Sequence, residues 1–127
     1  MSEFSDYLEA EILDHIFVDG GLAQPDTYIA LFTDNPGEDA SGTEVSGGSY
    51  ARKLFSDWTR STNTVSNNSA ITFVESTGSW GTVTHVAIFD AITAGNMLCY
   101  TALDSSQAVA SGQIARFAAG ELTISLD

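Results

Sequence analysis

Residues 82–103 read TVTHVAIFDAITAGNMLCYTAL, and this stretch decides the fold. Two runs rich in β-branched and aromatic residues, 82–89 and 96–103, flank the short segment AITAGN at 91–96. Such side chains favour strands, and small, turn-forming residues between two strand-like runs are typical of a hairpin. The stretch therefore predicts two long antiparallel strands joined by a turn.

Further strand candidates lie on both sides of this hairpin, at 27–33, 49–55, 70–74, 113–117 and 121–126. Clusters of Gly, Asn, Ser and Asp separate them, as turns do. Short strands of this number and spacing predict a mainly β fold: an antiparallel β-sandwich, jelly-roll-like or a partly closed barrel. The chain shows no linker, internal repeat or second composition zone, so residues 1–127 are expected to form a single β-sandwich domain.

One amphipathic α-helix is expected at the N-terminus, over residues 3–18, with Ser2 as its N-cap and Gly20–Gly21 as its stop. At about 100° per residue, one broad apolar arc collects Phe4, Tyr7, Leu8, Ile12 and Ile16. Leu13 and Phe17 lie outside that arc, so packing on one flat sheet leaves them for a neighbouring chain. The helix is therefore expected to be a packing or docking element, with an assembly interface formed by Phe4, Leu8, Ile12, Leu13, Ile16 and Phe17.

Charge and cysteine content exclude several classes of partner. Seventeen Asp and Glu against four Lys and Arg give a formal net charge of −13 at pH 7. Such a negative field repels phosphate and anionic lipid, so neither nucleic acid nor a membrane is expected as a partner. Cys99 is the single cysteine, which excludes an intrachain disulfide and a cysteine-rich metal site. The N-terminus lacks the features of a signal peptide, so the chain is expected in the cytoplasm or in a particle assembled there.

An acidic loop, DNPGEDASGTEVSGGS at 34–49, follows the first strand candidate. Carboxylate oxygens are calcium ligands, but the spacing here departs from the calcium-binding loop pattern D-x-[DN]-x-[DN]-G. A solvated loop is the favoured interpretation, and calcium binding by residues 34–44 stays open. No metal and no cofactor is predicted.

The two histidines are the natural candidates for acid–base chemistry. His15 stands one turn after Glu11 and is expected to pair with it or with carbonyls at the helix end. On its strand, His85 should share a face with Val83 and other apolar residues, so it is expected in the core or at a packing interface, with a ring nitrogen bonded to a hydroxyl or a carbonyl. No loop histidine stands beside a reactive Ser or Cys, so no catalytic residue is predicted; a carboxylate pair is the remaining enzymatic alternative.

Aromatic residues are expected mainly in the core or at interfaces, in preference to a sugar-binding platform. Trp80, between two glycines in GSWG, is the one expected to be partly exposed. Trp80, Tyr50 and Arg52 are therefore the candidate ligand contacts. The alternative for Arg52 is that it neutralises carboxylates in a very acidic chain.

Six segments occur in a recognisable order: FSDYLEAEILDHIF, TYIALFTDNPG, EVSGGSYAR, NSAITF, WGTVTHVAIFDA and RFAAGELTISLD. Together they resemble a family of small tailed-bacteriophage virion proteins, commonly labelled tail fibre or structural proteins. The resemblance covers nearly the whole chain and departs mainly in 56–68. No segment is a catalytic signature, so no functional residue is carried over.

The resemblance implies a non-enzymatic structural component of a tailed-phage virion, tail-associated as a fibre, baseplate or adaptor protein and assembled in the host cytoplasm. The partners it implies are other virion proteins and copies of the chain itself, with a trimer favoured among homo-oligomers. Two alternatives stay open: a capsid decoration (cement) protein, and a module that binds a host surface glycan through exposed aromatic side chains.

Overall fold

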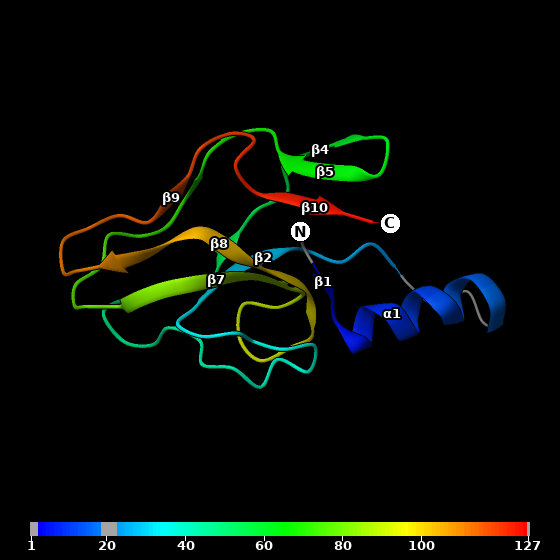
Figure 1. Cartoon of the computed structure of the whole chain (residues 1–127), viewed down its shortest axis with the longest axis horizontal. Coiled ribbons are helices and arrows are strands. Elements are labelled where there is room, and N and C mark those ends of the chain that lie inside the picture. Colours follow the sequence, from blue (N-terminus) through cyan, green and yellow to red (C-terminus); the bar gives the residue numbers. More distant parts are fainter. Residues whose placement is uncertain (1–2, 19–22, 127) are drawn as a thin grey trace.

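The computed structural model describes residues 3–18 and 23–126, and in them the chain is mainly β with one N-terminal helix (Figure 1). The described strands form three open antiparallel sheets of five, three and two strands, and none of these closes into a barrel. The prediction of a mainly β, antiparallel fold with an N-terminal helix is confirmed. A main core cluster joins side chains from all three sheets, with the large sheet on one side and the two small sheets on the other.

The five-stranded sheet is built on the predicted hairpin. β7 (Gly81–Phe89) pairs with β8 (Met97–Val109), and β2 (Tyr28–Phe32) pairs with the other edge of β7. Two short strands complete the order β1-β8-β7-β2-β3: β1 (Glu3–Phe4) beside β8, and β3 (Lys53–Leu54) beside β2.

Asp90 closes the turn of this hairpin. Its Oδ1 accepts a hydrogen bond from the Asn96 N–H at 2.7 Å, and its Oδ2 accepts one from the Asn96 side-chain amide at 3.0 Å. Gly95 has φ +73°, and a Cβ there would lie 2.6 Å from the Cβ of Ala91. The tight turn therefore requires glycine at this position.

A bulge in the hairpin changes which side chains share a face. The register of β7 against β8 shifts between Val83 and His85. Val83 consequently joins Val86 and Ile88 in the main core cluster, on the face away from His85. The prediction that Val83 shares a face with His85 is therefore wrong, because strict alternation does not continue through a bulge.

Both faces of β2 are buried in the five-stranded sheet. Ile29 and Leu31 of β2 enter the main core cluster, whereas Ala30 and Phe32 belong to a second cluster on the opposite face. There the ring of Phe32 stacks on that of Phe89 with centroids 6.1 Å apart. Burial on both sides explains why β2 reads as a continuous apolar run rather than an alternating one.

Two smaller sheets cover the main core cluster. In the first, β5 (Thr64–Asn67) lies between β4 (Trp58–Ser61) and β10 (Thr123–Ser125). The second pairs β6 (Ile71–Thr72) with β9 (Arg116–Phe117). Their inward side chains pack on the cluster, among them Trp58, Ile71, Phe117 and Ile124.

The β4–β5 hairpin was not predicted, because its strands are rich in polar residues and lack a clear apolar alternation. Its signal is the two-residue connection Thr62–Asn63 between segments with β-branched side chains, and Thr62 has φ +56°. Conversely, the strand predicted at 49–55 shortens to Lys53–Leu54. Ser49 has φ +64°, and the Tyr50 N–H closes a turn onto the Gly47 carbonyl, so the extended conformation begins later.

Asn67 fixes the C-terminal segment to the second layer. It is 1% exposed, and its Nδ2 donates to the carbonyls of Ser69 and Ala118, both at 2.9 Å. Its Oδ1 accepts a hydrogen bond from the Leu122 N–H, also at 2.9 Å. A buried amide is tolerated only when its hydrogen bonds are satisfied in this way. Ala118 and Leu122 lie 51 and 55 residues away in the sequence, so the sequence pattern does not predict this role of Asn67.

The helix begins later than predicted. α1 (Asp6–Leu13) starts after β1, because Glu3–Phe4 is extended and pairs with β8. Ser5 is the N-cap: its Oγ accepts a hydrogen bond from the Leu8 N–H at 3.2 Å and donates one to the Met97 carbonyl. The predicted cap Ser2 and stop Gly20–Gly21 lie outside the described residues.

Candidate assembly interface

The six side chains predicted as an assembly interface divide into two groups. Phe4 and Leu8 are half-buried and pack on the main core cluster, and Ile12 is half-buried as well. The other three are exposed, namely Leu13, Ile16 and Phe17. The first turns of the N-terminal segment therefore fasten it to the β layers, and only its far end is available to a partner.

The exposed group extends into a single π-helical turn, η1 (Asp14–Val18), that continues α1. Val18 joins it, and we call Leu13, Ile16, Phe17 and Val18 the apolar tip. Their exposed fractions are 57%, 63%, 75% and 78%, and no residue of α1 or η1 is fully buried. α1 extends away from the sheets at one end of the long axis (Figure 1). Large apolar side chains gathered in this way mark an interaction surface.

Val18, the last residue of the expected helix, was not among the predicted interface residues. The signal is the uninterrupted apolar run Ile16–Val18. π-helical turns are rare and frequently occur at functional sites, which agrees with a role for η1 beyond packing.

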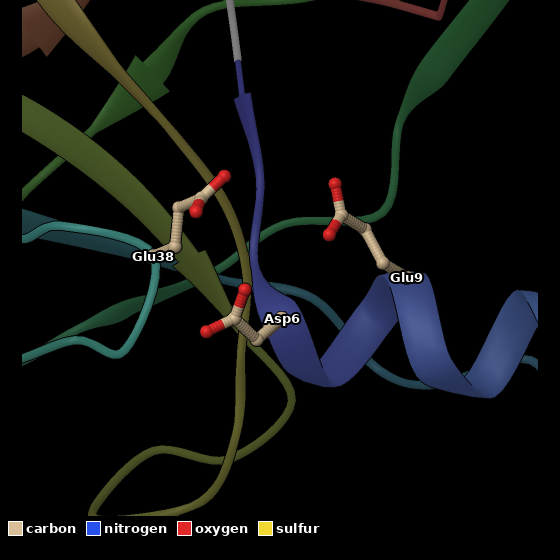
Figure 2. Close-up of side chains that lie close together, drawn as sticks. All are labelled: Asp6, Glu9 and Glu38. Carbon is tan, nitrogen blue, oxygen red and sulfur yellow. The ribbon is translucent and has the colours of Figure 1, made fainter.

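Three carboxylates converge beside the start of α1 (Figure 2). Asp6 and Glu9 come from the first turn of the helix and Glu38 from the acidic loop; all are exposed, and one oxygen of each lies within 4.8 Å of the others. The Asp6 N–H donates to the Glu38 carbonyl at 3.3 Å, which holds loop and helix together. Such oxygens suit a hard cation such as calcium, although exposed acidic groups also gather without an ion.

The other carboxylates of the acidic loop are used to fold it. Asp34 and Asp39 accept hydrogen bonds from backbone N–H groups of the loop, at 2.6 and 3.1 Å. Hydrogen bonding to the Ser41 side chain, and then to the Ser41 N–H, lowers the pKa of Asp39. Glu44 pairs with Arg52, so of the loop's four acids, Asp34, Glu38, Asp39 and Glu44, only Glu38 joins the cluster. This arrangement supports the interpretation as a solvated loop.

Repulsion within the acidic cluster predicts a pH effect on stability. Asp6, then Glu9, raise the pKa of Glu38 above its ordinary value of 4.5. A carboxyl whose pKa is higher in the folded state than in the unfolded state destabilises the fold when it is ionised. This loss of stability begins as the pH rises through the unfolded-state pKa and is complete above the folded-state pKa. Glu38→Gln should therefore raise the melting temperature at pH 7, and its advantage over the wild type should vanish below about pH 4.5.

Thermal unfolding between pH 4 and pH 7 measures this difference. Glu75→Gln is the matched control, because Glu75 is exposed but lies outside the cluster, and it should change the melting temperature little. A lower melting temperature for Glu38→Gln at pH 7 would contradict the account.

Trp80 lies in the core, so the prediction that it is partly exposed is wrong. It is 3% exposed, its Nε1 donates to the Gly48 carbonyl at 2.9 Å, and its ring meets that of Tyr50 edge-on with centroids 5.3 Å apart. The nearby glycines admit the ring rather than expose it: a Cβ on Gly48 would lie 2.9 Å from Nε1. A ring buried in this way offers no face to a sugar.

Arg52 is a buried clamp rather than a ligand contact. Its side chain is 7% exposed, and Nε and Nη2 donate to the two carboxylate oxygens of Glu44 at 2.9 and 2.8 Å. Nη1 donates to the carbonyls of Ala91 and Ala94 at 2.9 and 2.8 Å, and the guanidinium lies 3.7 Å from the centroid of Phe89. Arg52 thus ties the acidic loop to the turn of the β7–β8 hairpin, which confirms the alternative that it neutralises a carboxylate.

Tyr50 completes the same arrangement. Its hydroxyl donates to Glu44 at 2.7 Å and accepts a hydrogen bond from the Leu31 N–H at 3.0 Å. Burial, followed by the hydrogen bond to Glu44, raises the pKa of Tyr50. The phenol therefore stays protonated and serves the fold.

The histidines and the cysteine do not come together. His85 is half-buried, and its Nδ1 lies 2.8 Å from the Thr84 hydroxyl, so the predicted hydroxyl partner is confirmed. His15 is exposed and, within the described residues, makes no ion pair with Glu11, so that predicted pair does not form. Cys99 is buried, and burial raises the pKa of its thiol to about 12, as suits a small core residue.

Comparison with known proteins agrees with the resemblance seen in the sequence. A family model described as "Podophage GP4 fiber I protein gp80" matches residues 3–125. The match includes 56–68, the stretch that the resemblance left out, and it contains every residue of the apolar tip. No curated protein matches the chain. No helix among the described residues has the length and apolar character needed to cross a membrane.

Proposed function

The chain belongs to the family described as Podophage GP4 fiber I protein gp80 and is thus a tail-associated structural protein of a phage virion, and from this premise we propose that it is a non-enzymatic fibre subunit held in place by its apolar tip. Its partners on this proposal are other virion proteins, copies of itself included. The observation that carries it is the exposure of Leu13, Ile16, Phe17 and Val18 at the end of a projecting helix.

Hydrophobic energetics favour a covered tip. Burying one large aliphatic or aromatic side chain contributes about 1.5–3 kcal/mol, and the four tip side chains are 57–78% exposed in the isolated chain. Part of that free energy becomes available when a partner covers them. A permanently exposed patch would instead promote aggregation, so a protein that works inside an assembly is the better explanation.

Charge also favours an apolar contact. A net charge of −13 makes copies of this chain repel one another, and an attachment surface must overcome that repulsion locally. Ile16, Phe17 and Val18 form an uncharged run that can do so.

The alternatives differ in how much supports them. The family description names a fibre protein, which favours a fibre over a baseplate piece, an adaptor or a capsid decoration protein. The glycan-binding alternative loses the residues on which it rested, because Trp80 is buried and the donors of Arg52 bond within the chain.

The test is whether a chain with a charge in its tip still enters particles. Leu13→Asp should leave the β layers folded and remove the protein from purified virions. Virions with the normal amount of a folded Leu13→Asp chain would overturn the proposal.

A further inference from the structure

Negative charge is concentrated in the part of the chain that carries the apolar tip. Eleven of the seventeen Asp and Glu residues lie in residues 1–51, and none of the four Lys and Arg residues does. Residues 52–127 hold the other six acids together with all four cations, so that part of the chain is close to electrical balance. The apolar tip therefore belongs to a strongly acidic part of the molecule.

The fold gathers several of these acids along the helix that leads to the tip. Five of them lie on α1, on η1 or on the acidic loop beside the start of α1, and we call them the acidic collar: Asp6, Glu9, Glu11, Asp14 and Glu38. Four are exposed and Glu11 is half-buried. Figure 2 shows the three that converge at the start of α1. Repulsion from Asp6, then Glu9, raises the pKa of Glu38, so these charges already act on one another.

Helix stability does not explain the collar acid nearest the end of the helix. Asp14 is the C-cap of α1, at the point where α1 passes into η1, and the last turn of α1 holds no basic residue. The dipole of a helix favours cations toward its C-terminal end, so a carboxylate here costs stability instead of adding to it. An interaction with a cation outside the chain would offset that cost.

An acidic collar beside an apolar tip argues against two possible occupants. Helices that lie in membrane surfaces are rich in Lys and Arg on their polar face, because those surfaces are negative, and α1 and η1 contain neither residue. A second copy that met this tip with its own would place two acidic collars against one another. The surface that complements both features is an apolar pocket with Lys or Arg at its rim.

We propose that the apolar tip seats in an apolar pocket of a different virion protein, and that Lys and Arg side chains at the rim of that pocket pair with the acidic collar. The inference rests on the proposed function and narrows the partner of the tip to a protein other than the chain itself. Glu11 and Asp14 are the collar acids nearest the tip in the sequence, so they make the pairs that border the apolar contact. The tip supplies apolar area, and the collar supplies orientation and faster association.

Phage particles assembled without this chain provide the probe. The purified chain is added to them at increasing concentrations, the particles are sedimented, and the bound chain is measured by quantitative mass spectrometry. The dissociation constant should rise at least about 10-fold between about 50 mM and about 500 mM NaCl, because salt screens the attraction between the collar and a basic rim. A contact made by the apolar side chains alone would hold or strengthen in added salt.

Two double variants separate the collar from the net charge of the chain. Glu11→Gln with Asp14→Asn removes two charges beside the tip and keeps the side-chain shapes, so the dissociation constant at low salt should rise about 10-fold. Neutralising Asp14 favours the helix dipole, so weaker binding would not reflect a lost helix. Asp104→Asn with Glu121→Gln is the matched control: it removes two charges at exposed positions outside the collar and should leave binding unchanged. Equal effects of the two pairs, or tighter binding by the collar pair, would overturn the inference.

The failure of this inference can be told apart from failure of the proposed function. If Leu13→Asp no longer binds the particles but the wild type binds equally at low and high salt, the basic rim is refuted and the tip remains the attachment surface. A wild type that associates with itself in analytical ultracentrifugation, where Leu13→Asp stays monomeric, would likewise overturn only the inference. A Leu13→Asp chain that binds the particles as tightly as the wild type would overturn both.

Discussion

Virions assembled with Leu13→Asp as their only copy of this chain are expected to contain less than about one tenth of the normal amount of it. Central apolar contacts typically contribute 2 kcal/mol or more, and a carboxylate in their place adds the cost of burying an unpaired charge. Such a loss corresponds to at least about a 30-fold weaker contact. Quantitative mass spectrometry of purified particles measures the amount directly.

Leu54→Asp is the matched control. Leu54 lies on the edge strand β3 and is 53% exposed, against 57% for Leu13, so the same substitution is made at similar exposure but away from the tip. It should leave the amount in virions unchanged. Equal loss for both variants would show that any added carboxylate blocks assembly, and the role of the tip would then be refuted.

Arg52→Ala is expected to lower the free energy of unfolding by about 3 kcal/mol, because it breaks a largely buried ion pair. The substitution leaves the Glu44 carboxylate without its bidentate partner and the carbonyls of Ala91 and Ala94 without donors. It also removes the guanidinium from the face of Phe89. Urea unfolding followed by tryptophan fluorescence measures the change.

Two further variants separate charge from geometry. Arg52→Lys keeps the charge but loses the planar fork, so it should recover only part of the lost stability. Arg60→Ala removes an exposed arginine whose guanidinium donates to the Thr62 carbonyl, and it should cost less than about 0.5 kcal/mol. An Arg52→Ala variant no less stable than Arg60→Ala would contradict the clamp.

The central hairpin could be predicted because its signals are local. The strand-like runs of β7 and β8, and the turn between them, are readable within about twenty residues. The bulge between Val83 and His85 was not readable in this way, because it arises from the pairing of two strands. Between Val83 and His85 the partner on β8 changes from Gln107 to Ala102, and this irregularity was enough to place Val83 on the wrong face.

The roles of Arg52 and Trp80 depend on contacts across the fold. Arg52 bonds to Glu44 eight residues away but also to Ala91 and Ala94, 39 and 42 residues away. Trp80 bonds to Gly48, 32 residues away. Flanking glycines and a nearby cation suggested exposure and ligand binding, whereas the tertiary structure buries both side chains.

At the N-terminus, helical periodicity correctly separated Leu13 and Phe17 from the packing arc. It could not show that Phe4 belongs to a strand, since pairing with β8 decides this. Helical periodicity also could not show that Leu8 packs on the core whereas Ile16 lies beyond the core. The extent of the surface on which the helix packs is set by other elements.

A cryo-EM map of the parent phage tail tests the central claim most directly. The account predicts that the chain fills density in a fibre and that Leu13, Ile16, Phe17 and Val18 are covered by a neighbouring subunit. Density for the chain on the capsid, or a fibre in which these four side chains stay open to solvent, would contradict it.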